Sequence, residues 1–181
     1  MPDLPTLRRL ILLRHAEAVP ADLGSFSAEA DMARPLTHDG EQAAIRCGLW
    51  LHANGLRPDA VLCSPAVRTQ QTLSGVQRAL PALATKSVLL CPDIYEAEAG
   101  ALAQALRQVP TQARTVLLIG HNPGISDFAR WLDSRDELLD QGFAPAGLAV
   151  FDMPGSDLVP DQSSWANCDS ASLVLHTFTR P

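Results

Sequence analysis

The chain of 181 residues has the length of one domain and is long enough to bury a continuous core. Hydrophobic residues make up 46% of it and charged residues 19%, which is typical of a globular protein. The formal net charge of -6 at pH 7 excludes a general electrostatic attraction to nucleic acid or to an anionic membrane. Any anion must therefore be bound by a local group of cations.

The first apolar run, from Leu10 to Leu13, is too short for the core of a signal peptide or for a membrane span. We therefore expect a cytoplasmic protein. The cysteines have no CxxC spacing, so we interpret them as small buried side chains rather than zinc ligands or disulfides. They are Cys47, Cys63, Cys91 and Cys168.

The first predicted strand covers residues 7–13 and runs directly into Arg14, His15, Ala16 and Glu17. The end of a buried strand is where open α/β sheets place their chemistry. A polar loop of roughly twenty residues follows, and loops of that length are usually functional or disordered. It ends at Arg34-Pro35-Leu36.

A helix is predicted over residues 38–54. Thr37 is expected to be its N-cap, with Asp39 and Glu41 in the first turn, where acidic side chains favour the positive end of the helix dipole. Gly55 is expected to terminate it. The next strand, 59–63, leads into Ser64-Pro65, which predicts an N-cap followed by proline at the first helical position and places Arg68 one turn into the helix.

The remaining elements continue the alternation of apolar and helix-period segments. We predict strands at 87–91, 114–119, 147–152 and 172–178, a helix at 99–108, and a helix that starts at Asn122-Pro123 and reaches about residue 135. The segment 154–170 is rich in Pro, Ser, Asp and Gly and is interpreted as a surface excursion. The pattern predicts a single domain over residues 1–181, a three-layer α/β/α sandwich with a mostly parallel central sheet.

Three strand ends of this sheet deliver two arginines and two histidines, Arg14, His15, Arg68 and His121. These residue types hold and attack a phosphoryl group. Neutral imidazole is nucleophilic at pH 7, so His15 is predicted to form a phosphohistidine, with its other ring nitrogen donating to a backbone carbonyl. The two guanidinium groups and His121 are predicted to contact the phosphoryl oxygens.

These motifs together resemble the histidine phosphatase superfamily, which has the phosphoglycerate mutase-like fold, and within it the short bacterial SixA-like branch. The resemblance rests on four motifs in the family's order: Leu13 to Ala18, Arg34 to Thr37 with Gly40, Ser64-Pro65 with Arg68 and Thr72, and Gly120 to Gly124. It implies a phosphatase without a metal or organic cofactor.

The proton donor is left open. The resemblance implies a glutamate in an E-x-x-x-G pattern, which Glu96 and Gly100 fit, but Glu98 and Glu17 are alternatives, and so is an exposed acidic loop without a catalytic role. Ala16 stands where the larger family usually has glycine, and the polar residues that follow in mutases are missing, which argues against a mutase.

Ala16 and Asn122 are predicted to bind substrate. Arg34 is predicted either to line the pocket or to anchor the long loop.

The leading hypothesis is a metal-independent phosphohydrolase that acts through a phosphohistidine on His15, with a phosphohistidine protein as substrate. A small phosphate monoester is an alternative substrate, and a non-catalytic phosphate-binding protein of the same fold is an alternative function. A metal-dependent hydrolase is disfavoured because no HxxxH or DxH ligand pair is present. Neither nucleic acid nor a membrane is expected as a partner, and the oligomeric state is left open.

Overall fold

The computed structural model describes residues 7–22, 24, 27–154 and 164–181. Its centre is a six-stranded sheet in the order β3-β2-β4-β1-β5-β6. Strands β1 to β4 run parallel, β5 is antiparallel to β1, and β6 is antiparallel to β5. The strands are β1 (Arg8–Arg14), β2 (Ala60–Cys63), β3 (Ser87–Leu90), β4 (Thr115–Gly120), β5 (Leu148–Met153) and β6 (Val174–Thr179).

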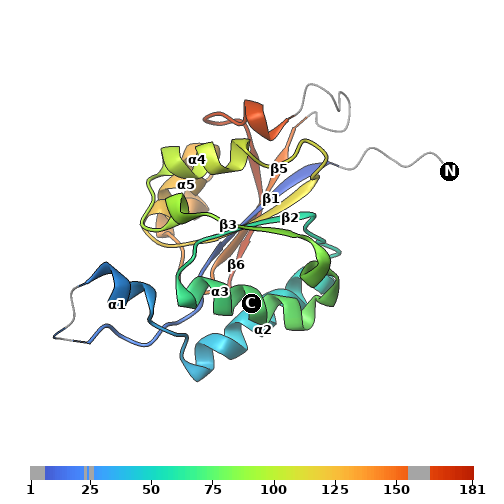
Figure 1. The fold of residues 1–181 in the computed structure, drawn as a ribbon. Coiled ribbons are helices and arrows are strands. Elements are labelled where there is room, and N and C mark those ends of the chain that lie inside the picture. Colours follow the sequence, from blue (N-terminus) through green and yellow to red (C-terminus); the bar gives the residue numbers. More distant parts are fainter. Residues whose placement is uncertain (1–6, 23, 25–26, 155–163) are drawn as a thin grey trace.

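Helices cover both faces of the sheet, as Figure 1 shows. Side chains of β1 alternate between the faces: Ile11 and Leu13 pack with α2 (His38–Ala53) and α3 (Val67–Ala79), whereas Leu10 and Leu12 pack with α4 (Ala99–Arg107) and α5 (Gly124–Leu132). The predicted three-layer sandwich with a mostly parallel sheet is therefore confirmed, and the central strand β1 is buried on both sides.

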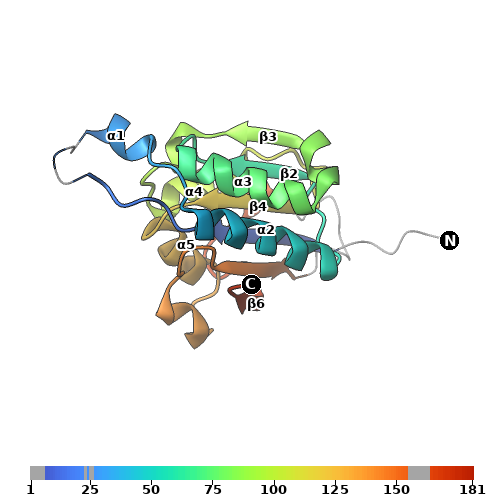
Figure 2. The ribbon, with the colours of Figure 1, turned by 90° about the horizontal axis from the view of Figure 1, so that it is seen from below.

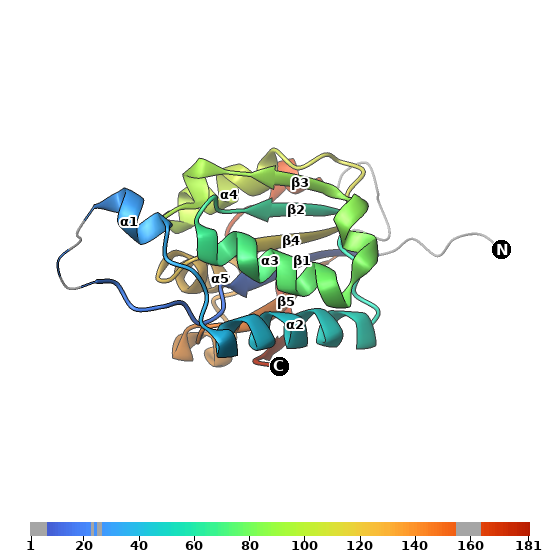
Figure 3. The same cartoon turned by 60° about the horizontal axis from the view of Figure 1, so that its bottom comes forward.

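Helix α1 (Ala28–Met32) differs from the other helices because it has no buried residue. It projects from one end of the sheet, beyond the ends of β2 and β3 (Figures 2 and 3). The loop predicted between Glu17 and Arg34 thus contains a short helix that the sequence pattern did not indicate.

Short 3₁₀ helices cover Pro81–Thr85, Pro92–Ile94, Glu137–Gln141 and Trp165–Asn167. Most of the predicted surface excursion at 154–170 lies outside the described residues. Where the chain is described, no helix is both long and apolar enough to cross a membrane.

The start and end of α2 agree with the prediction. The Thr37 side chain accepts a hydrogen bond from the Gly40 N–H at 3.0 Å, and Asp39 and Glu41 lie in the first turn. Gly55 follows the helix with φ of +67°, a left-handed conformation that glycine adopts at little cost. The local capping signals were sufficient here.

Two predicted helix starts are wrong. Helix α3 begins at Val67, with Ala66 in the cap position and no side-chain cap, and the Ser64 hydroxyl lies two residues before that cap, in contact with His121. Helix α5 begins at Gly124 with Pro123 in the cap position.

The end of α5 also differs from the prediction. It ends at Leu132 rather than near 135, because Asp133 leaves the helical conformation and its carboxylate accepts a hydrogen bond from the Leu175 N–H of β6.

Candidate active site

His15 follows β1 directly, and its ring orientation is fixed by its own neighbour in the chain. Its Nδ1 lies 2.8 Å from the carbonyl oxygen of Ala16. Because a carbonyl only accepts, Nδ1 must carry the proton and Nε2 must carry the lone pair. The expected contact of the second ring nitrogen with a backbone carbonyl is present.

The second histidine, His121, lies beside the first at the end of β4, with ring centroids 5.2 Å apart. Burial lowers the pKa of His15 to about 4, and the positive charges of Arg68, Arg14 and Arg34 act in the same direction. Burial and the charge of Arg68 lower the pKa of His121 to about 3. Both imidazoles are therefore neutral at pH 7, which leaves the His15 lone pair free to attack.

Arg14 and Asn122 are held by the same backbone carbonyl. Arg14 Nη1 donates to the Phe143 oxygen at 2.7 Å, and Asn122 Nδ2 donates to it at 2.9 Å. The amide oxygen of Asn122 accepts from the Ser126 hydroxyl. Both ends of the Asn122 amide are thus engaged within the protein, so its position suits it to orienting Arg14.

Arg68 lies in the first turn of α3, and Asp31 of α1 holds it from outside. Its Nη1 donates to the Asp31 backbone oxygen at 2.6 Å and its Nη2 donates to the Asp31 carboxylate at 2.9 Å. The same carboxylate accepts from Arg34 Nε at 2.9 Å and from the Tyr95 hydroxyl at 2.7 Å. Helix α1 is therefore tied to the site by one acidic side chain.

The charge state of Asp31 follows from these contacts. Burial opposes its ionisation, but the hydrogen bonds from Tyr95, Arg34 and Arg68 outweigh burial and lower its pKa to about 2. Three guanidinium groups and one carboxylate leave a net local charge of about +2, which matches a dianionic phosphoryl group.

Three side-chain nitrogens around His15 are buried without a hydrogen-bond partner in the described part of the chain. They are Arg14 Nε, Arg68 Nε and His121 Nδ1. Buried polar atoms without partners are costly, so these nitrogens beside a neutral histidine are candidates for contact with a bound molecule. An oxyanion is an acceptor that suits the two guanidinium nitrogens, and it suits His121 Nδ1 when that nitrogen carries the ring proton.

Of the other predicted residues, Ala16 is buried and both its backbone polar groups are used: its N–H donates to Thr72 Oγ1 at 3.0 Å and its carbonyl binds His15. It has no free donor for a substrate. Glu96 is exposed and has φ of 50°, and its side chain makes no hydrogen bond within the described residues. Glu17 and Glu98 are also exposed.

A family model described as the histidine phosphatase superfamily (branch 1) matches residues 10–117. The chain belongs to the histidine phosphatase superfamily. An uncharacterised protein of Mycobacterium tuberculosis is 30% identical over 176 residues, with 93% of this chain and 99% of that protein covered. An uncharacterised chloroplastic protein of Arabidopsis thaliana is 32% identical over 138 residues, with 72% of this chain and 62% of that protein covered.

This histidine phosphatase is similar in structure to SixA proteins. A candidate phosphohistidine phosphatase SixA from Nakamurella multipartitia has a TM-score of 0.78 and 29% identity, covering 99% of each chain. A second from Agrobacterium tumefaciens has a TM-score of 0.74 and 27% identity, covering 97% of this chain and 99% of that one. The phosphoglycerate mutase-like fold and the phosphatase class are thereby established.

Three residues of this histidine phosphatase site escaped the sequence analysis. Asp31 lies three residues before Arg34, a spacing that suits an ion pair within one helical turn. Tyr95 precedes Glu96, and its ring meets His121 edge-on at 5.4 Å between centroids. The Phe143 carbonyl carries no side-chain signal, so no sequence pattern identifies it.

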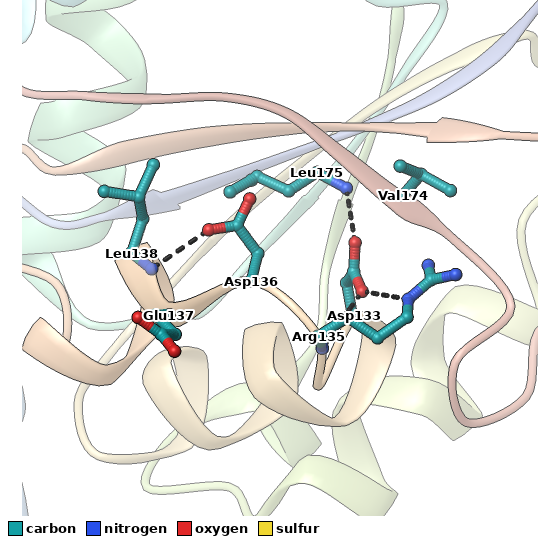
Figure 4. Close-up of a pocket in the computed structure, with 7 residues that line it drawn as sticks. All are labelled: Asp133, Arg135, Asp136, Glu137, Leu138, Val174 and Leu175. Atoms are coloured by element: carbon teal, nitrogen blue, oxygen red, sulfur yellow. Dashed lines mark hydrogen bonds and ion pairs between the residues drawn. The ribbon is translucent and has the colours of Figure 1, made fainter.

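A groove of about 770 Å³ lies elsewhere, between the end of α5 and β6. Figure 4 shows that Asp133 accepts there from Leu175 and Arg135, and that Asp136 accepts from Leu138. These polar groups are paired and serve structure. A smaller groove of about 320 Å³ is lined in part by Asp31 and Arg34, and Asp31 joins it to Arg68.

Proposed function

We propose that this phosphatase is a metal-independent phosphohydrolase that transfers a phosphoryl group to Nε2 of His15. The observation that carries the proposal is a set of three buried nitrogens, Arg14 Nε, Arg68 Nε and His121 Nδ1, which have no hydrogen-bond partner among the described residues, together with a histidine whose lone pair is free. Phosphoryl transfer depends mainly on positioning and on donors aimed at the equatorial oxygens. Arginines supply here the positive charge that a metal ion supplies in other phosphatases.

The reaction has two steps. The Nε2 lone pair of His15 attacks phosphorus, the bond from phosphorus to the leaving group breaks, and the leaving group takes up a proton. Water then attacks the phosphohistidine, the P–N bond breaks, and phosphate leaves with the lone pair restored to Nε2. Arg14, Arg68 and His121 hold the phosphoryl oxygens in both steps.

We propose a protein phosphohistidine as the substrate. The similarity to SixA proteins over nearly the whole chain supports this choice. The exposed position of Glu96 also supports it, because an imidazole leaving group needs less acid assistance than an alkoxide. A small phosphate monoester is the second candidate, favoured by the groove of about 320 Å³ beside Arg34.

A phosphoenzyme trap tests the mechanism. A radiolabelled phosphate donor is added in the presence of EDTA, and base-stable, acid-labile label is measured on wild type, on His15→Ala and on His38→Ala. His38 is an exposed histidine at the start of α2 and serves as the matched control. We expect label on wild type and on His38→Ala but none on His15→Ala. Hydrolysis without label on wild type contradicts the covalent mechanism.

A further inference from the structure

The Ser64 hydroxyl is the fixed partner of the second histidine. Ser64 is fully buried after β2, and its Oγ lies 2.8 Å from His121 Nε2. Its backbone is held on both sides, since its N–H donates to Ile119 and its carbonyl accepts from the Thr69 hydroxyl. The hydroxyl therefore stays at this place and has only its proton to orient.

Two arrangements of protons are compatible with this contact. His121 is neutral and carries one ring proton. With the proton on Nε2, the imidazole donates to Ser64, and a buried Nδ1 lone pair is left among the phosphate-binding groups, where it repels an oxyanion. With the proton on Nδ1, the Ser64 hydroxyl donates to Nε2, and Nδ1–H is free to bind a phosphoryl oxygen.

The surroundings of Ser64 favour the second arrangement. The Ala66 N–H lies 3.4 Å from Oγ and uses it as an acceptor. The hydroxyl proton then needs an acceptor of its own, and within the described residues His121 Nε2 is the acceptor in reach. The second arrangement leaves the hydroxyl and Nε2 both satisfied in the free protein.

We propose that Ser64 is a positioning residue that donates to His121 Nε2 and thereby holds the ring proton of His121 on Nδ1. The consequence for catalysis rests on the proposed function, whereas the position of the proton does not. The two neutral histidines then differ in the hydrogen-bond partner of one ring nitrogen, Nδ1 in His15 and Nε2 in His121. A carbonyl acceptor makes His15 expose a lone pair, and a hydroxyl donor makes His121 expose a proton.

The experiment reads the proton position directly. Two-bond ¹H–¹⁵N correlation spectra of ¹⁵N-histidine-labelled protein at pH 7 distinguish the Nδ1–H and Nε2–H forms of each ring. The His121 signals are assigned by their loss in His121→Gln. We expect the Nδ1–H form for His121 in wild type. An Nε2–H signal in wild type overturns the proposal without any variant being needed.

Variants then test whether Ser64 is the cause. Ser64→Ala is expected to shift His121 toward the Nε2–H form, and Ser64→Cys, which keeps a weak donor, to shift it less. Ser74→Ala, at an exposed serine of α3, is expected to leave the spectrum unchanged. A His121 spectrum that stays in the Nδ1–H form in Ser64→Ala overturns the role of Ser64.

Kinetics connect the tautomer to the reaction. Loss of an oxyanion-stabilising donor costs about 10²–10³-fold in kcat, and we expect Ser64→Ala to lose about tenfold because part of the population keeps the correct tautomer. KM is expected to change less than kcat. If wild type shows the Nδ1–H form but hydrolyses no phosphate donor, the proposed function fails while the assignment of the proton stands.

Discussion

At the scale of single residues, the three nitrogens of the Arg68 guanidinium have different surroundings. Both terminal nitrogens serve Asp31, and the buried Nε has no partner in the described chain. A planar guanidinium allows this because its donors point in fixed, different directions, so Nε remains available to a bound phosphoryl group while the terminal nitrogens bind Asp31. A lysine ammonium at the same place has one nitrogen and cannot bind Asp31 and a phosphoryl oxygen in the same geometry.

We therefore expect Arg68→Lys to lower kcat/KM by about 10- to 100-fold, the effect of losing one hydrogen bond to a charged group. Steady-state kinetics with phosphohistidine and with a monoester measure it. Arg78→Lys, at an exposed arginine near the end of α3, is the matched control and is expected to be neutral. If Arg68→Lys keeps the wild-type kcat/KM, Arg68 does not bind the phosphoryl group, and the phosphate site must be sought elsewhere.

Glu96 is the residue whose role depends most on the substrate. Its carboxylate is exposed, close to the site only through its neighbour Tyr95. If Glu96 protonates the leaving group, Glu96→Gln lowers kcat on an alkyl phosphate by about 10²-fold, with a smaller loss on phosphohistidine. Glu98→Gln is the control, since Glu98 is an equally exposed glutamate two residues away. Equal losses on both substrates, or none, remove Glu96 as the acid.

At the scale of elements, α1 is held to the molecule by polar contacts. It buries no side chain, and Asp31 is the residue that joins it to Arg68 and Tyr95. A segment with few buried contacts opens at low free-energy cost. We expect Asp31→Ala to speed backbone hydrogen exchange of residues 28–34, with α2 and α3 unaffected.

Glu29→Ala is the matched control for this variant, because Glu29 is exposed on the same helix. Hydrogen exchange followed by mass spectrometry resolves the segment. Unchanged exchange in Asp31→Ala shows that α1 is held by other contacts.

The elements that the sequence predicted share a local cause. Strand β1 is a run of apolar residues, and α2 is marked by Thr37 at one end and Gly55 at the other. Helix α1 and the Ser64 hydroxyl were missed or misread because their partners are distant in the chain. Asp31 meets Arg68 across 37 positions, and Ser64 meets His121 across 57. Tertiary contacts there override a short-range signal.

At the scale of the whole molecule, the site makes folding depend on pH. The pKa of His15 is lowered by burial to about 4 and that of His121 to about 3, against 6.5 for an ordinary histidine. Below pH 6.5 the unfolded chain therefore binds more protons than the folded one. The free energy of unfolding falls as the pH drops from 6.5 to about 4, and further to about 3 through His121.

The expected change in the free energy of unfolding is large enough to measure by urea denaturation. Each unit of pKa shift corresponds to about 1.4 kcal/mol, and a domain is stable by about 5–15 kcal/mol, so two such histidines remove a large part of the total. We expect the urea midpoint to fall steadily between pH 6.5 and 4, and His15→Gln to flatten that slope. His38→Gln, at an exposed histidine, is expected to keep the wild-type slope. A wild-type midpoint that is constant from pH 7 to 5 means that the two imidazoles are not buried in the neutral form, and the nucleophile argument loses its electrostatic basis.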